Sequence, residues 1–181
     1  MKSFKLLVIL IITVELCNFV YAQEIKMIKL NTNENRLTIL ASLDTPVPDE
    51  IIDLLKNGVK ITIVYYIQIL EERPFWLIYD KTIYKKDVEK IVTYNIWEKT
   101  FYLKEGKNLY KIKNVEELQR RLMNINNIRL ISLKQIKKKK NLYIRVKAKL
   151  ESIKLFPPLS WIYDLVITRS FETSWKIKKI K

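Results

Sequence analysis

Apolar residues alternate with other residues over a long stretch of the first half of the chain, from Val59 to Ile69. All odd-numbered positions of this stretch are apolar or aromatic, whereas its even-numbered positions are mixed. Side chains of a β-strand point alternately to the two faces of a sheet, so this period of two predicts a strand with one core face. The same alternation recurs in residues 37–43 and 142–150. Strands with one apolar face are typical of antiparallel sheets that pack on one side.

The remaining periodic segments predict further strands and two short helices. The additional strands are expected in residues 88–104, 128–136 and about 165–180. In the first of these, the apolar positions change parity, so a bulge or a short turn is expected at residues 95–99. Residues 48–56 and 115–124 have acidic first turns and are expected to be helical. We therefore expect a mainly β fold, namely an antiparallel β-sandwich of about eight strands with two short helices.

The N-terminus has the layout of an export signal. Two lysines precede an apolar run from Leu6 to Val14, and the small residue Ala22 stands where a signal peptidase cleaves. This run is shorter than the about 20 residues of a spanning helix. We expect residues 1–22 to be a signal peptide and residues 23–181 to be one β-sandwich domain, exported to the periplasm or another extracytoplasmic site. The alternative is a protein anchored to the inner membrane by an uncleaved N-terminal segment.

The residues on which common catalytic sites depend are missing from the sequence. It contains no histidine, and its single cysteine, Cys17, lies in the expected signal peptide. The mature chain therefore forms neither a His-based triad nor a His-bearing or thiolate zinc site. Its two glycines, Gly58 and Gly106, are too far apart for a phosphate-binding loop. We expect no enzymatic activity, no metal and no cofactor. The alternative is a hydrolase that uses carboxylates alone, with Asp80 or Asp87 joining a distant acidic residue.

Positive charge is concentrated in lysine clusters. The chain has 34 Lys and Arg residues against 19 Asp and Glu residues, a formal net charge of +15. Four consecutive lysines are expected to form a hairpin tip between two strands and are a candidate anion-binding or surface-binding site: Lys137, Lys138, Lys139 and Lys140. An exported protein rarely meets nucleic acid, so the expected polyanion is an anionic lipid or an envelope polymer, reached by peripheral membrane contact. The alternative is a solvated basic surface without a ligand.

Aromatic residues crowd the middle of the chain, between Tyr65 and Tyr102. In strands such residues are ordinary core and cross-strand partners, and this is the interpretation we favour for them. Beside positive charge, aromatic rings also stack on ligands. Because proline is confined to edges, bulges and bends of sheets, the residues near Pro74 and Pro158 are candidates for an exposed aromatic rim. This candidate rim consists of Phe75, Trp76 and Trp161.

Four stretches of the chain form a distinctive order: LLKNGVKITIVYYIQI, ERPFW followed by VTYN and EKTFYL, NVEELQRRL, and LYIRVKAKLESIKLFPPL with a terminal FETSW. In this order they resemble the bacterial family DUF4390. The resemblance covers nearly all of the expected mature chain. It implies an exported, β-rich protein. In some bacteria, members of this family are encoded near envelope-sensing histidine kinases, and this location implies an accessory role. It carries no functional residues over to this chain.

These observations predict a non-enzymatic extracytoplasmic β-sandwich that binds a protein partner or an envelope component in an accessory role. One alternative is an electrostatic binder of anionic lipid or envelope polymer that uses its lysine clusters. The second alternative is the carboxylate-only hydrolase.

Overall fold

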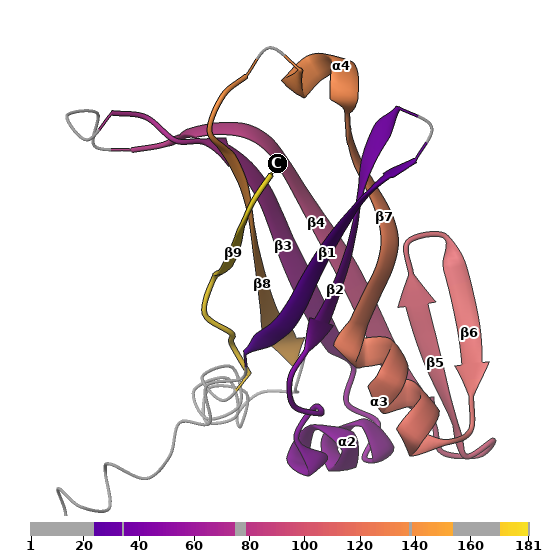
Figure 1. Cartoon of the computed structure of the whole chain (residues 1–181). Helices are drawn as coiled ribbons and strands as arrows, with labels where there is room; N and C mark the ends of the chain where they lie inside the picture. Colours follow the sequence, from indigo (N-terminus) through magenta and orange to yellow (C-terminus); the bar gives the residue numbers. More distant parts are fainter. Residues whose placement is uncertain (1–23, 34, 75–78, 138, 154–170, 181) are drawn as a thin grey trace, which may run out of the picture.

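The larger part of the fold is a six-stranded antiparallel sheet with the strand order β6-β5-β4-β3-β8-β9. The computed structural model describes residues 24–33, 35–74, 79–137, 139–153 and 171–180. In chain order, the strands of this sheet are β3 (Ile61–Glu71), β4 (Lys81–Asn95), β5 (Thr100–Glu105), β6 (Asn108–Ile112), β8 (Leu142–Ile153) and β9 (Lys176–Lys179). The long strands β3, β4 and β8 form the centre of the sheet, and β6 and β9 are its two edges (Figure 1).

A three-stranded antiparallel sheet packs against one face of the six-stranded sheet. It has the order β1-β2-β7 and consists of β1 (Ile25–Asn33), β2 (Arg36–Leu43) and β7 (Asn124–Ser132). Buried residues of both sheets belong to one hydrophobic core cluster. The structure therefore confirms the predicted antiparallel β-sandwich.

The inner faces of the sheets follow the alternation of the sequence. In β3, the side chains of Ile63, Tyr65 and Ile67 are fully buried, and each lies opposite a residue of β8 on the same face. In β8, Val146 and Ala148 are equally buried. The cross-strand register brings the two apolar rows side by side, and this pairing is the unit of sheet stabilisation.

Two helices cover one end of the sandwich, as predicted. Helix α2 (Asp49–Lys56) buries Ile51, Ile52 and Leu55. Helix α3 (Val115–Met123) buries Leu118 and Leu122. No helix in the described part of the chain is long and apolar enough to cross a membrane.

Two sequence-based expectations about the second half of the chain are wrong. The expected strand 128–136 ends at Ser132, because Leu133–Ile136 forms the short helix α4. The lysine segment 137–140 is not a hairpin tip, because β7 and β8, which flank it, belong to different sheets. It is a crossover from the small sheet to the large one. Of the expected last strand, only Lys176–Lys179 forms regular ladder pairs among the described residues. Residues 165–170 lie outside those residues.

Lysine side chains of the large sheet donate hydrogen bonds to backbone carbonyls at both edges of the small sheet. At the β1 edge, Lys178 donates to the Ile28 carbonyl at 2.7 Å. At the β7 edge, Lys86 donates to the Arg129 carbonyl at 2.8 Å and Lys90 donates to the Asn124 carbonyl at 2.5 Å. Unpaired carbonyls of an edge strand otherwise attract another chain. Part of the excess positive charge therefore serves to satisfy the edges of the small sheet.

Candidate functional site

The turn between β4 and β5 is held in place by its own side chains. The Asn95 side-chain oxygen accepts hydrogen bonds from the backbone N–H groups of Trp97 at 3.0 Å and Glu98 at 3.1 Å. The Thr100 hydroxyl donates to the Glu98 carbonyl at 2.8 Å. Asparagine often organises a turn in this way, because its short side chain replaces a backbone acceptor. The prediction of a break within residues 95–99 is confirmed.

Glu98 ties this turn to the neighbouring strands. Its carboxylate accepts a hydrogen bond from the Tyr102 hydroxyl at 2.7 Å and pairs with the Lys111 ammonium at 2.8 Å. The hydrogen bond from Lys111, followed by that from Tyr102, holds the pKa of Glu98 below its usual value. The turn is thus connected to β5 through Tyr102 and to β6 through Lys111.

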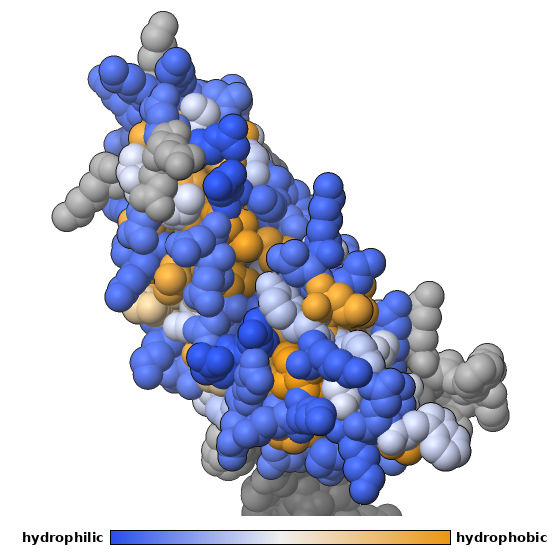
Figure 2. Space-filling view, turned by 90° about the vertical axis from the view of Figure 1, so that its right-hand side faces the viewer, coloured by the Kyte–Doolittle hydropathy of each residue, from blue (hydrophilic) through white to orange (hydrophobic). Residues whose placement is uncertain are grey.

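This braced turn presents large apolar side chains to solvent. Trp97 is 95% exposed and Ile96 is 58% exposed. We call Ile96 and Trp97 the hairpin surface. On the edge strand β6, Leu109 is 65% exposed, but it lies opposite Lys104 near the other end of β5. An open depression of about 430 Å³ lies beside Trp97, lined by the turn and by Tyr94 and Tyr102. Figure 2 faces the side of the molecule on which β6 lies and shows hydrophobic groups, some of them adjacent, within a mainly hydrophilic surface.

The β4–β5 turn and the β5–β6 hairpin together form a lysine-rich surface. Residues 96–113 contain five lysines and two glutamates. Both glutamates are neutralised, because Glu98 pairs with Lys111 and Glu105 pairs with Lys90 of β4. The other four lysines take part in no ion pair within the described residues: Lys99, Lys104, Lys107 and Lys113. The surface therefore combines exposed apolar groups with uncompensated positive charge.

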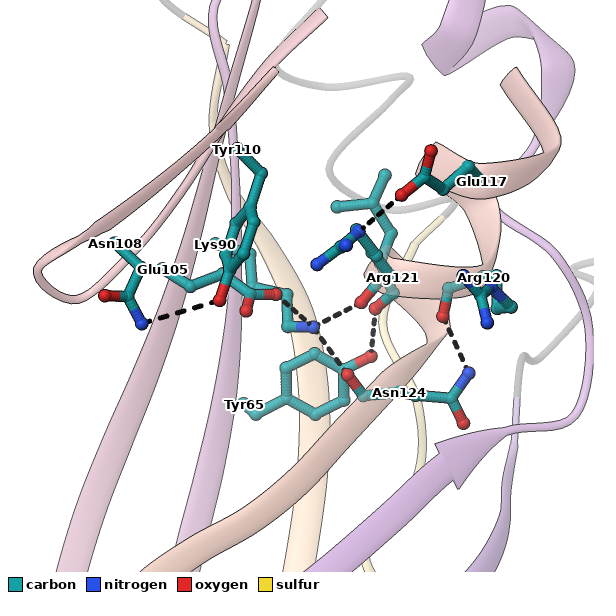
Figure 3. Close-up of polar contacts among 10 residues, drawn as sticks. Tyr65, Lys90, Glu105, Asn108, Tyr110, Glu117, Arg120, Arg121 and Asn124 are labelled. Carbon is teal, nitrogen blue, oxygen red and sulfur yellow. Dashed lines mark hydrogen bonds and ion pairs between the residues drawn. The ribbon is translucent and has the colours of Figure 1, made fainter. Parts of the chain in front are cut away.

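A second polar cluster surrounds the buried ammonium group of Lys90 (Figure 3). The Lys90 side chain is only 3% exposed. It pairs with the Glu105 carboxylate at 2.8 Å and donates to the backbone carbonyls of Arg121 and Asn124. An ammonium group has three donors, and each of them has an acceptor here. Burial lowers the pKa of Lys90, which the Glu105 carboxylate partly offsets.

The Lys90 cluster satisfies the C-terminal end of helix α3. The last carbonyls of a helix have no partner within the helix, and its C-terminus carries partial negative charge. Besides the contacts of Lys90, the Tyr65 hydroxyl donates to the Leu122 carbonyl at 2.5 Å, and the Asn124 amide donates to the Arg120 carbonyl at 2.7 Å. Burial raises the pKa of Tyr65. Lys90 and Tyr65 are therefore structural supports of this helix end.

A groove of about 710 Å³ lies next to this cluster, between β4, the β5–β6 hairpin and β7. Val88, Tyr110 and Ile128 supply apolar lining, while Lys86 and Arg121 supply charge. Arg121 stacks on the Tyr110 ring at 4.3 Å and pairs with Glu117 at 3.0 Å. Arg121 of the lining is thus engaged with the protein itself, whereas Lys104 of the lining forms no ion pair within the described residues.

The structure places the predicted lysine site at the opposite end of the molecule from the hairpin surface (Figure 1). Lys137 and Lys140 are exposed, whereas Lys139 is partly buried and pairs with Glu71 of β3 at 3.3 Å. Lys138 lies outside the described residues. The three described lysines of this segment consequently differ in environment.

The aromatic residues also divide into different environments. Tyr65 and Phe101 are buried, which confirms the core interpretation for them. For Trp97 and Tyr79 that interpretation is wrong, because both are exposed. The parity change at residues 95–99 is the sequence feature that separates Trp97 from the strands on either side. The predicted rim residues Phe75, Trp76 and Trp161 all lie outside the described residues.

The acidic candidates have basic or hydroxyl partners. Asp80 accepts hydrogen bonds from the Tyr143 hydroxyl at 2.5 Å and from the Arg73 N–H at 3.0 Å. Asp87 lies 3.7 Å from the Lys85 ammonium. The hydrogen bond from Tyr143 is the largest cause that holds the pKa of Asp80 below its usual value. Within the residues that the structure describes, no group of three or more metal-ligating side chains comes together.

Comparison with known proteins identifies a family for this chain. A family model described as a domain of unknown function (DUF4390) matches residues 22–178. No curated protein and no solved structure matches the chain. The match covers nearly the whole chain and confirms the resemblance seen in the sequence. The chain therefore belongs to the DUF4390 family.

Proposed function

We propose that this protein is a non-catalytic, extracytoplasmic binding protein that contacts a protein partner through the hairpin surface. The observation that carries the proposal is the almost complete exposure of Trp97 on a turn that side-chain hydrogen bonds hold in one conformation. The described residues leave nearly all of the Trp97 side chain in contact with water. A protein partner that covers Trp97 would gain the free energy of that burial.

The contacts of the turn also favour tight recognition. Tryptophan is enriched among the interface residues that contribute most to binding free energy. A side chain on an ordered turn loses less conformational freedom on binding than one on a disordered loop. Asn95 and Glu98 restrict the turn before any partner arrives.

Replacing Trp97 by Ser tests the proposal. A photocrosslinking residue at Lys99 is expected to capture a defined partner in living cells, and Trp97→Ser is expected to reduce the yield at least tenfold, because a central aromatic anchor contributes about 2 kcal/mol or more. The matched control is Ile177→Ser, which removes an apolar side chain that is 59% exposed on the other edge strand. Its yield is expected to stay at the wild-type level. Equal yields from the two variants, with unchanged melting temperatures, would contradict the proposal.

A second candidate function rests on the end of the molecule near α4. The Ile180 N–H donates to the Leu142 carbonyl at 2.9 Å, and Lys179 lies opposite Tyr143 in the ladder. This pairing brings the C-terminal lysines next to the segment that contains Lys140. Four exposed lysines then share this end of the molecule: Lys134, Lys137, Lys140 and Lys179. Such a basic end suits an anionic lipid surface, where each lysine contributes about 1 kcal/mol.

A charge-removal experiment tests this candidate. Replacing the four lysines of the α4 end by Gln is expected to reduce sedimentation with phosphatidylglycerol-rich vesicles at least tenfold, and binding by the wild type is expected to weaken with added salt. The control replaces four exposed lysines elsewhere: Lys26, Lys56, Lys60 and Lys85. If both quadruple variants lose the same amount of binding, net charge rather than the α4 end is responsible, and the candidate is wrong.

A further inference from the structure

Three of the four edges of the two sheets carry features that discourage pairing with another strand. The β1 edge is held by Lys178 and the β7 edge by Lys86 and Lys90. The register of β7 with β2 also shifts twice, which indicates bulges, and bulges interrupt edge pairing. The β9 edge has the sequence Lys-Ile-Lys-Lys, and all four residues are exposed. Charged, short edges of this kind repel an added strand.

The fourth edge, β6, is also short and carries Lys111, but within the described part of the chain it has no register shift and no side chain that donates to its outward carbonyls. Its register with β5 runs without a shift from the pair Glu105 and Asn108 to the pair Phe101 and Ile112. Glu105 and Asn108 flank a two-residue turn, and such a closing pair exchanges both ladder hydrogen bonds. Because hydrogen-bonded pairs alternate along an antiparallel ladder, Leu109 and Lys111 direct their N–H and C=O groups away from β5.

These outward backbone groups are free to accept a partner. Outside the ladder with β5, whose hydrogen bonds alternate past these two residues, no described residue forms a hydrogen bond with the backbone N–H or C=O of Leu109 or Lys111. Figure 1 shows β6 at the outer margin of the molecule, with no strand beyond it. The edge therefore offers two N–H donors and two C=O acceptors in the geometry of a strand.

The side chains along this edge specify the chemistry of the partner. Leu109 is exposed and lies on the outer face together with Lys104 and Lys111, whereas Tyr110 and Ile112 lie on the other face. Lys107 and Lys113 flank the strand, and the nearby carboxylates are already paired with lysines. Opposite charges directly across a strand pair stabilise it, whereas like charges destabilise it. An extended segment with alternating residues fits this pattern when its acidic residues lie on the face of the lysines and its apolar residues lie on the face of Tyr110 and Ile112.

We infer that β6 accepts an extended, acidic segment of a protein partner as an added strand of the six-stranded sheet. The inference rests on the proposed function, since it specifies how the partner docks beside the hairpin surface. In this form of recognition, main-chain hydrogen bonds supply affinity and alternate side chains supply specificity. Trp97 then covers an apolar group of the same partner.

Hydrogen exchange with synthetic peptides tests the added strand directly. The probe is the peptide Thr-Glu-Val-Glu-Val-Glu-Val-Thr at 1 mM, and the control peptide has Lys at each Glu position. The acidic probe is expected to slow exchange of the Leu109 and Lys111 amides at least tenfold, because both become hydrogen-bonded, and to leave the amides of β9 unchanged. Absence of this protection with the acidic probe, or equal protection by the two peptides, would overturn the inference.

A proline substitution separates strand addition from contact with the hairpin surface. Leu109→Pro removes an outward N–H without removing a ladder bond to β5, and proline is tolerated on edge strands. Leu109→Thr keeps the N–H and a strand-forming side chain. Peptide protection of the Lys111 amide is expected to disappear in Leu109→Pro and to persist in Leu109→Thr. Protection that persists in both variants would contradict strand addition. If Leu109→Pro disturbs β6 itself, the exchange rates of the wild type still decide the question.

The in-cell crosslink from Lys99 distinguishes failure of strand addition from failure of the proposed function. Loss of the crosslink in Trp97→Ser together with retention in Leu109→Pro would leave the proposed function intact and overturn strand addition. Retention of the crosslink in Trp97→Ser would contradict the proposed function, whichever result the peptides give.

Discussion

Replacing Lys90 by Met is expected to lower the free energy of unfolding by roughly 3–5 kcal/mol, the range for removing one partner of a buried, hydrogen-bonded ion pair. The ammonium group donates to the carbonyls of Arg121 and Asn124 and pairs with Glu105. Met preserves much of the side-chain volume but supplies no donor, so two carbonyls at the end of α3 lose their partner. Each unsatisfied buried acceptor costs about 1–3 kcal/mol.

Two controls make this result specific. Lys85→Met removes a neighbouring lysine of β4 whose side chain is 56% exposed, and it is expected to change stability by at most about 0.5 kcal/mol. Tyr65→Phe removes only the donor to the Leu122 carbonyl and is expected to cost about 1–3 kcal/mol. Urea denaturation measures all three variants. In some proteins, apolar residues replace buried ion pairs without a loss of stability. If Lys90→Met is as stable as the wild type, α3 does not depend on this ammonium group.

Replacing Phe171 by Ala is expected to lower the free energy of unfolding by roughly 3–5 kcal/mol, as for other truncations of buried Phe side chains. Phe171 is fully buried and belongs to the core cluster. Hydrogen bonds fix its segment on β8: the Leu150 N–H donates to the Phe171 carbonyl at 3.0 Å, and the Thr173 N–H donates to the Ala148 carbonyl at 2.9 Å. These bonds limit the collapse of the cavity that the truncation leaves.

The control for Phe171 is Ile177→Ala, which removes an exposed apolar side chain from the same C-terminal segment. It is expected to change stability by about 0.5 kcal/mol or less. A calorimetric or urea measurement compares the two. A loss below about 1 kcal/mol in Phe171→Ala would indicate that the segment is not part of the cooperative core.

The regular elements of this fold could be predicted well from the sequence. The alternation in residues 59–69 and 142–150 predicted the two central strands β3 and β8, because strand periodicity requires only local residues. The helices α2 and α3 were predicted within one residue at each end. The change of parity at residues 95–99 located the β4–β5 turn. In each case the information lies within about ten consecutive residues.

The predictions that were wrong concern which segments of the chain lie next to one another in the fold. The lysine segment 137–140 was expected to join paired strands, but β7 pairs with β2 and β8 pairs with β3. Alternation does not specify the sheet that a strand joins, because both sheets present similar apolar faces to one core. The core interpretation of Trp97 was wrong for a related reason, since exposure depends on what packs against the turn. The contacts that support the turn come from Tyr102 and Lys111 on the following strands.

The sequence by itself determined the class of the protein: a mainly β chain of the DUF4390 family with an excess of lysine and without histidine. Tertiary structure alone decided what individual lysines do. Lys86, Lys90 and Lys178 satisfy edge carbonyls, whereas Lys104, Lys107 and Lys113 near β6 form no ion pair within the described residues. A lysine has the same chemistry at each of these positions. Its role differs because the acceptor within its reach belongs to a strand that is distant in the sequence.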